Sequence, residues 1–148
     1  MRLPKDFEEY VREGVIKKCS INNSRAKFLI EGSKKSFKGL NKRLNIMGID
    51  EYNANSIVKD CYDMLMELIR ARLLLDGYNS SGSFAHEAEV SYMKKIGFND
   101  NDVSFTNDLR YFRNSITYYG KILTVEYAKK IADFTKKIYP KLEAIIKH

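Results

Sequence analysis

The sequence contains few of the residues that mark secreted or multidomain proteins. Its 148 residues include two cysteines, Cys19 and Cys61, and two prolines. So few cysteines favour free thiols in a reducing cytosol over a disulfide scaffold, with a single bridge as the alternative. Because proline is scarce and no Gly/Ser-rich linker is present, we predict a single domain over residues 1–148.

Long apolar runs are also absent. The first twenty residues carry acidic side chains early and no continuous apolar stretch, which argues against a secretory signal. The most apolar segment, CYDMLMELIRARLLLDG, is interrupted by two acids and two arginines, so it is not predicted to span a membrane. We therefore predict a cytoplasmic protein without membrane contact.

The alternating pattern that predicts a strand is missing, whereas helical periodicity covers nearly the whole chain. Helices are predicted over about residues 5–18, 23–45, 52–76, 84–95 and 103–118, with a last helix from about residue 124. Ser83 and Thr124 are predicted N-caps, and Pro140 is predicted to bend the last helix. The predicted fold class is all-α, an antiparallel helical bundle of about five or six helices.

The formal net charge of +7 is unevenly spread, because residues 17–43 hold nine Lys or Arg against one acid, Glu31. On a helical wheel, the lysines of the predicted helix 23–45 gather on one side of its apolar stripe. Such a face is either ordinary solvated surface or a surface that attracts phosphate. The residues predicted to bind RNA or phosphate here are Lys27, Lys34, Lys38 and Lys42, with Lys35 beside them.

Residues 109–121, LRYFRNSITYYGK, combine core positions with a polar surface. Four apolar or aromatic residues fall within one narrow arc of the helix and are predicted to face the core: Leu109, Phe112, Ile116 and Tyr119. Arg113 lies at the edge of this arc, where an arginine often only packs its stem. A guanidinium, an amide and a phenol can equally hold phosphate and stack on bases, so Arg110 and Tyr119 are predicted to bind RNA or phosphate.

The order of these segments resembles the HEPN superfamily. The resemblance rests on the long basic helix, the long helix ending in DGY, the SFAHEAEVSY segment and LRYFRNSITYYGK before a final helix. It covers residues 22–146, with residues 1–21 as an N-terminal helical extension. HEPN proteins are small helical bundles, often found in prokaryotic toxin–antitoxin and defence systems beside minimal nucleotidyltransferases. Active members are metal-independent endoribonucleases whose two motifs meet across a homodimer.

The family motif is an arginine, commonly followed by a polar residue, with a histidine four to six residues further along. Arg113 matches the arginine and Asn114 the polar residue, while Tyr118 stands where a histidine is expected. The resemblance therefore implies Arg113, Asn114 and Tyr118 as catalytic residues. Imidazole exchanges protons near neutral pH, whereas a phenol with an ordinary pKa of about 10 is mostly a donor there. The departure from the motif implies weak or absent catalysis.

Helix geometry separates the two ends of this motif. Five positions on a regular helix place Arg113 and Tyr118 about 140° apart. The two side chains share one site only if the helix loosens near Gly120 or if a second subunit completes the site. We therefore expect a homodimer.

Three other groups of residues are candidates for a site. His86, the only internal histidine, is either a surface or cap residue near a helix start or a relocated acid–base group. Three acids occur at helical spacing, Asp60, Asp63 and Glu67, but no His or Cys completes a ligand set, so no metal site is predicted. Cys61 falls on the apolar stripe and is predicted to be buried.

Three functions remain open at this level. The first is a HEPN-like RNA-directed protein, either a weak metal-independent endoribonuclease or an inactive one. The second is a non-catalytic module that binds RNA or a nucleotide. The third is a scaffold or partner subunit of a minimal nucleotidyltransferase. None of the three implies a cofactor.

Overall fold

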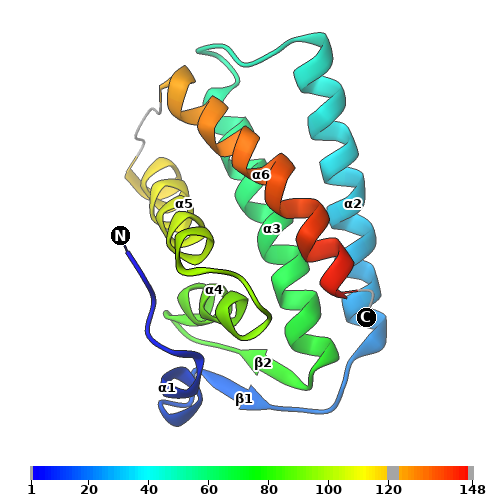
Figure 1. The fold of residues 1–148 in the computed structure, drawn as a ribbon, viewed down its shortest axis with the longest axis vertical. Coiled ribbons are helices and arrows are strands. Elements are labelled where there is room, and N and C mark those ends of the chain that lie inside the picture. The colour runs from blue at the N-terminus through cyan, green and yellow to red at the C-terminus, as the bar shows by residue number, and fades with distance from the viewer. Residues whose placement is uncertain (1, 120–123, 147–148) are drawn as a thin grey trace.

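The structure is a computed structural model that describes residues 2–119 and 124–146, and only the backbone of residues 117–119. The described chain forms the helices α1 (Phe7–Arg12), α2 (Asn23–Ile46), α3 (Ala54–Leu75), α4 (Ala85–Lys95), α5 (Asp100–Tyr119) and α6 (Val125–Ile146), and the strands β1 (Ile16–Lys18) and β2 (Tyr78–Ser80). The predicted all-α bundle is confirmed (Figure 1). No described helix is long and apolar enough to cross a membrane.

Helix α3 forms the centre of the bundle and packs against α2, α4, α5 and α6. Thirteen of its 22 residues are buried, which is more than expected for a helix that is covered on only one side. The long helices alternate in direction along the chain, with α2 and α5 running one way and α3 and α6 the other (Figure 1). The predicted antiparallel packing is therefore found between α2 and α3, whereas α6 packs parallel to α3.

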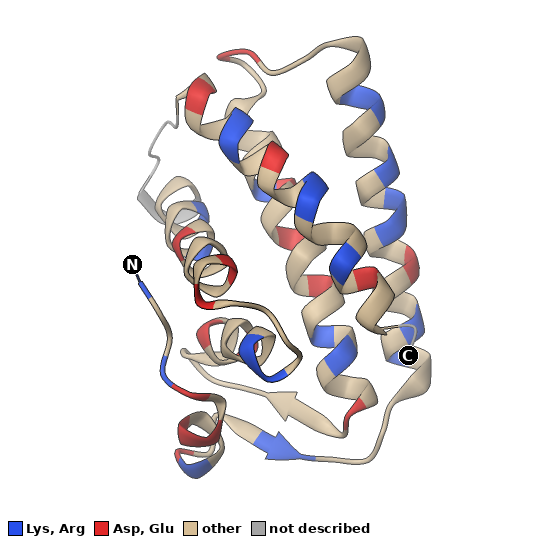
Figure 2. Cartoon of the chain, viewed as in Figure 1, with Lys and Arg blue, Asp and Glu red and all other residues tan. Residues whose placement is uncertain are grey.

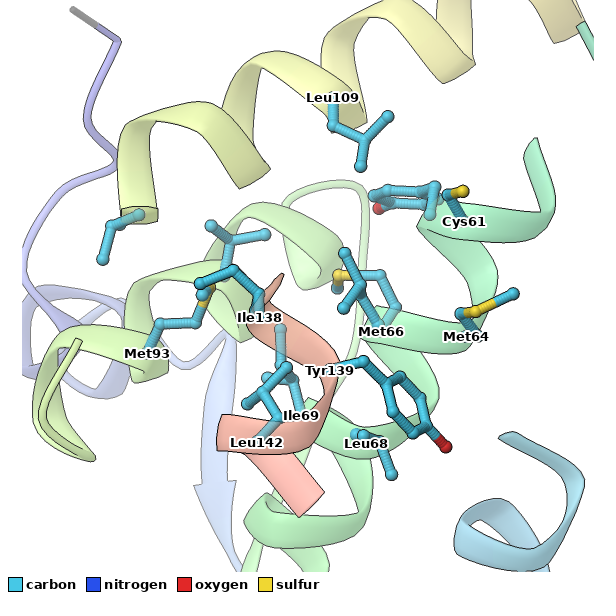
Figure 3. Close-up of a cluster of buried hydrophobic side chains, with 14 of the residues drawn as sticks. Cys61, Met64, Met66, Leu68, Ile69, Met93, Leu109, Ile138, Tyr139 and Leu142 are labelled. Atoms are coloured by element: carbon cyan, nitrogen blue, oxygen red, sulfur yellow. The ribbon is translucent and has the colours of Figure 1, made fainter. Parts of the chain in front are cut away.

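One apolar core joins α3 to its neighbours. Figure 3 shows Met66 and Ile69 of α3 packed near Ile138 and Leu142 of α6. Leu109 of α5 belongs to the same core and is fully buried. Because the burial of a large aliphatic side chain contributes about 1.5–3 kcal/mol, this cluster holds α5 firmly against α3.

The junction between α2, α3 and α6 contains a buried polar group with its partners. The Ser33 hydroxyl donates to the Met64 carbonyl at 2.7 Å and lies 3.0 Å from the Tyr139 hydroxyl. The Tyr139 ring stacks on Phe37 with centroids 4.0 Å apart. Buried hydroxyls paired in this way fix the contact between helices, because leaving one unpaired costs free energy.

The helix predicted over residues 5–18 is wrong beyond Arg12. Gly14 adopts a φ of +77°, which L-residues with side chains rarely adopt, and it ends α1. Strand β1 follows and pairs with β2 in antiparallel register, with Ile16 opposite Ser80. The N-terminal extension is therefore part helix and part strand. The two strands were not predicted, because a segment of only three residues is too short to show an alternating pattern of apolar and polar residues.

The predicted helix ends are partly correct. Thr124 accepts a hydrogen bond from the Tyr127 backbone N–H at 3.2 Å, as its predicted capping role requires. The Ser83 cap is wrong, because α4 begins after Phe84 and no side chain caps it. Helix α6 continues through Pro140 to Ile146.

Both cysteines are free, as the sequence favours, but only Cys19 is exposed. Burial raises the pKa of the Cys61 thiol to about 11, so this thiol stays protonated at neutral pH. We expect Ellman's reagent at pH 8 to titrate one thiol rapidly in the native protein and two in denaturant. Rapid reaction of both thiols in the native protein would contradict the buried position of Cys61.

Candidate functional site

A pocket of about 260 Å³ lies between the start of α4 and the middle of α5. Its lining residues are Gly82, Ser83, His86, Glu87, Arg110, Arg113 and Asn114. It brings together the two residues of the predicted arginine–asparagine motif and the only internal histidine of the chain. Two guanidinium groups, an amide and an imidazole thus share one small polar cavity.

The orientation of α5 places its polar residues in this pocket. Leu109 and Ile116 are buried and fix the apolar side of the helix against the core. Arg110, Arg113 and Asn114 are three and four residues apart, so they are neighbours on the adjoining surface of the helix. All three are half-buried, so each side chain is partly screened from water.

Arg113 has incompletely satisfied hydrogen-bond donors. Its Nη2 lies 3.8 Å from Oδ1 of Asp63, beyond ordinary hydrogen-bond distance, and its Cζ lies 5.6 Å from the centroid of the Tyr62 ring. Its Nε is buried without a hydrogen-bond partner among the described residues. A half-buried guanidinium without a close carboxylate partner is suited to an anionic ligand, which would supply acceptors to those of its donors that reach the pocket.

Asp63 is a weak counter-ion for this arginine. Its side chain is 53% exposed, and its contact with the guanidinium is long. Burial of part of the group raises the pKa of the Asp63 carboxyl, the positive charge of Arg113 lowers it, and the nearby Asp60 raises it. A phosphate in the pocket could therefore displace Asp63 from Arg113 at small cost.

Arg110 is held in place from two sides. Its Nε donates to Oδ1 of Asn107 at 3.0 Å, and its Nη2 lies 4.0 Å from Oε2 of Glu87. The other oxygen of that carboxylate accepts a 2.6 Å hydrogen bond from the Tyr10 hydroxyl of α1. The N-terminal helix therefore supports one wall of the pocket, a contact between distant segments that was not predicted from the sequence.

His86 faces the pocket from the first turn of α4, and its side chain is exposed. Its Nδ1 lies 3.3 Å from the hydroxyl of Tyr62, a buried residue of α3. Burial raises the pKa of Tyr62, so the phenol stays neutral and can either donate to Nδ1 or, in the tautomer that carries the proton on Nδ1, accept a hydrogen bond from it. In that tautomer the Nε2 lone pair remains free to take up a proton.

The predicted site residues are thus only partly assembled. Arg110, Arg113 and Asn114 line one pocket. The four predicted lysines of α2 do not line this pocket, because α2 and α5 lie at opposite edges of the bundle (Figure 2). One of them, Lys34, forms a 4.0 Å ion pair with Glu143. The side chains of Tyr118 and Tyr119, and Gly120, lie outside the described residues.

Within the part of the chain that the structure describes, no group of three or more His, Cys, Asp or Glu side chains is placed to hold a metal ion. Comparison of the chain with protein-family models, with curated protein sequences and with solved structures gives no significant match in any of the three. Function is therefore inferred from the residues and geometry of the pocket.

Proposed function

We propose that the protein is a HEPN-like, RNA-directed protein that cleaves RNA without a metal ion, using the pocket between α4 and α5. The observation that carries this proposal is that Arg113, Asn114 and His86 line the same cavity. The motif that resembles the HEPN family lacks its histidine, and His86 supplies an imidazole from another helix. The family resemblance adds a cytoplasmic homodimer to the proposal.

The proposed reaction is attack of the ribose 2′-hydroxyl on the adjacent phosphorus. His86 takes the 2′-hydroxyl proton at Nε2 while the 2′-oxygen bonds to phosphorus. The bond from phosphorus to the 5′-oxygen breaks, and the leaving oxygen takes a proton from water. The products are a 2′,3′-cyclic phosphate and a free 5′-hydroxyl, after which His86 returns its proton to solvent.

The two arginines would stabilise the charge that develops on the phosphate. Arg113 has no close carboxylate partner, since Asp63 lies 3.8 Å away, and Arg110, which faces Glu87, adds a second guanidinium in the same pocket. Asn114 lines the same pocket, and its amide would donate to a phosphate oxygen. Preorganised donors of this kind act most strongly where water is excluded, and the half-buried setting of these side chains screens them from water in part.

An RNA cleavage assay with chelator present tests the proposal. We expect wild-type protein to cut single-stranded RNA and Arg113→Ala to cut it at least a hundredfold more slowly, because one charge-stabilising group is lost. The matched control is Arg12→Ala, which removes an exposed arginine of α1 outside the pocket and should leave the rate unchanged. Absence of cleavage by the wild type, or equal cleavage by Arg113→Ala, would contradict the proposal.

A further inference from the structure

The positive charge of the protein is concentrated on two helices. Helix α2 contains seven Lys or Arg and one acid, and α6 contains five lysines and three acids. Together these helices carry a net charge of +8, whereas the whole chain carries +7, so all other residues sum to −1. Figure 2 shows basic positions along both helices, with some acidic positions on α6, while the elements at the opposite edge carry charges of both signs.

The outer face of α2 presents lysines without counter-ions. The inner side of the helix is buried through Ala26, Leu29, Ser33 and Leu40. Lys27, Lys35, Lys38 and Lys42 are exposed, and no ion pair is recorded for them among the described residues. Lys38 and Lys42 are four residues apart, so their Cα atoms are separated by about 6 Å along the helix. This face would attract a polymer that carries regularly spaced negative charges.

An aromatic side chain lies in the same row as these lysines. Phe28 is 76% exposed and precedes Lys35 by seven residues, which places both on the same side of α2. A phenylalanine ring in water has no packing role, but it can serve as a platform on which a base stacks. A second copy of this chain is a poor partner for the face, because the lysines of two copies would repel each other.

We propose that the outer face of α2 binds single-stranded RNA, with Lys27, Lys35, Lys38 and Lys42 on the phosphates and Phe28 against a base. The choice of RNA as the polymer rests on the proposed function of the pocket. The face and the pocket are separate, because α3 lies between α2 and α5 (Figure 1). The face would therefore bind an RNA strand independently of the pocket, which acts on one phosphate.

Binding is measured by fluorescence anisotropy with a labelled 2′-O-methyl oligouridine of about twelve nucleotides. This probe lacks the 2′-hydroxyl, so the pocket cannot cleave it and the measurement does not depend on catalysis. If four lysines contact phosphate, the slope of log K against log salt concentration is about −3 for a single strand. Absence of binding at low salt, or a slope near zero, would overturn the inference.

Two double variants with the same change in net charge locate the contact. Lys38→Glu with Lys42→Glu alters the α2 face, whereas Lys17→Glu with Lys18→Glu alters two exposed lysines of β1. We expect the α2 variant to bind at least tenfold more weakly and with a shallower salt slope, and the β1 variant to bind within about twofold of wild type. Equal weakening by both would overturn the inference, because net charge alone would then explain binding.

Phe28 provides a check that is independent of charge. Phe28→Ala should weaken binding about fivefold or more, since loss of one stacked base costs about 1–3 kcal/mol. Folding is not expected to suffer, because the side chain is exposed. Unchanged affinity in Phe28→Ala would overturn the stacking contact. If RNA cleavage is never observed but these binding results hold, the pocket proposal fails and the α2 surface stands.

Discussion

Substitution of His86 by glycine is expected to lower the rate of RNA cleavage by about a hundredfold or more. In the proposed reaction this imidazole accepts the 2′-hydroxyl proton, and a positioned general base contributes about 10²–10⁴-fold to a rate. The other histidine of the chain, His148, provides the matched control, and His148→Ala should cleave like the wild type. Rates are measured with saturating RNA, so that a change in affinity does not enter.

Chemical rescue separates a catalytic role from a structural one. His86→Gly removes the ring and leaves space at an exposed position that opens on the pocket. Free imidazole added to this variant should restore part of the activity, whereas it should not restore Arg113→Ala, which keeps its histidine. If imidazole fails to rescue His86→Gly while the variant remains folded, His86 is not the base.

Arg70→Ala is expected to destabilise the fold by about 3–5 kcal/mol. Arg70 of α3 donates two hydrogen bonds to Glu89 of α4, at 2.8 and 3.0 Å, and these bonds raise the pKa of the guanidinium. The Glu89 side chain is only 1% exposed and also accepts from the Ser80 hydroxyl. Removal of Arg70 leaves a buried carboxylate without its counter-charge, and breaking a buried pair in this way is costly.

The matched control for this prediction is a more exposed ion pair, which joins α2 to the central helix α3. Arg43 and Asp60 approach to 2.6 Å, but both side chains are 40% or more exposed. Arg43→Ala should therefore cost only about 0–1 kcal/mol. The free energy of unfolding of both variants is measured by urea denaturation. Equal destabilisation by Arg70→Ala and Arg43→Ala would contradict the buried role of the Arg70–Glu89 pair.

The long helices were predictable because their apolar period extends over many turns. The predicted helix 23–45 is observed as Asn23–Ile46, and 52–76 is observed as Ala54–Leu75. The two strands were not predictable in this way, since three residues contain too little alternation to distinguish from a loop. Their pairing depends on Tyr78–Ser80 lying beside the N-terminal segment, which is a tertiary contact.

The candidate site was predicted only where its residues share one helix. Arg113 and Asn114 are adjacent in the sequence, and a wheel places Arg110 near them. The contact between His86 and Tyr62 joins α4 to α3. It was not predictable, because a tyrosine on the apolar stripe of a helix cannot be distinguished from an ordinary core residue in the sequence. A wheel likewise shows that the α2 lysines share a face, but it does not show on which side of the bundle that face lies.

We propose that His86 and Arg113 share one phosphate-binding pocket. The most direct test is NMR of the histidine ring protons during titration with uridine 3′-monophosphate. The chain has only two histidines, so each signal is assigned by one substitution. We predict that the His86 signal shifts saturably in the wild type and in Arg12→Ala, and that it stays in place in Arg113→Ala. A His86 signal that does not move in the wild type, or that moves equally in Arg113→Ala, would contradict the claim.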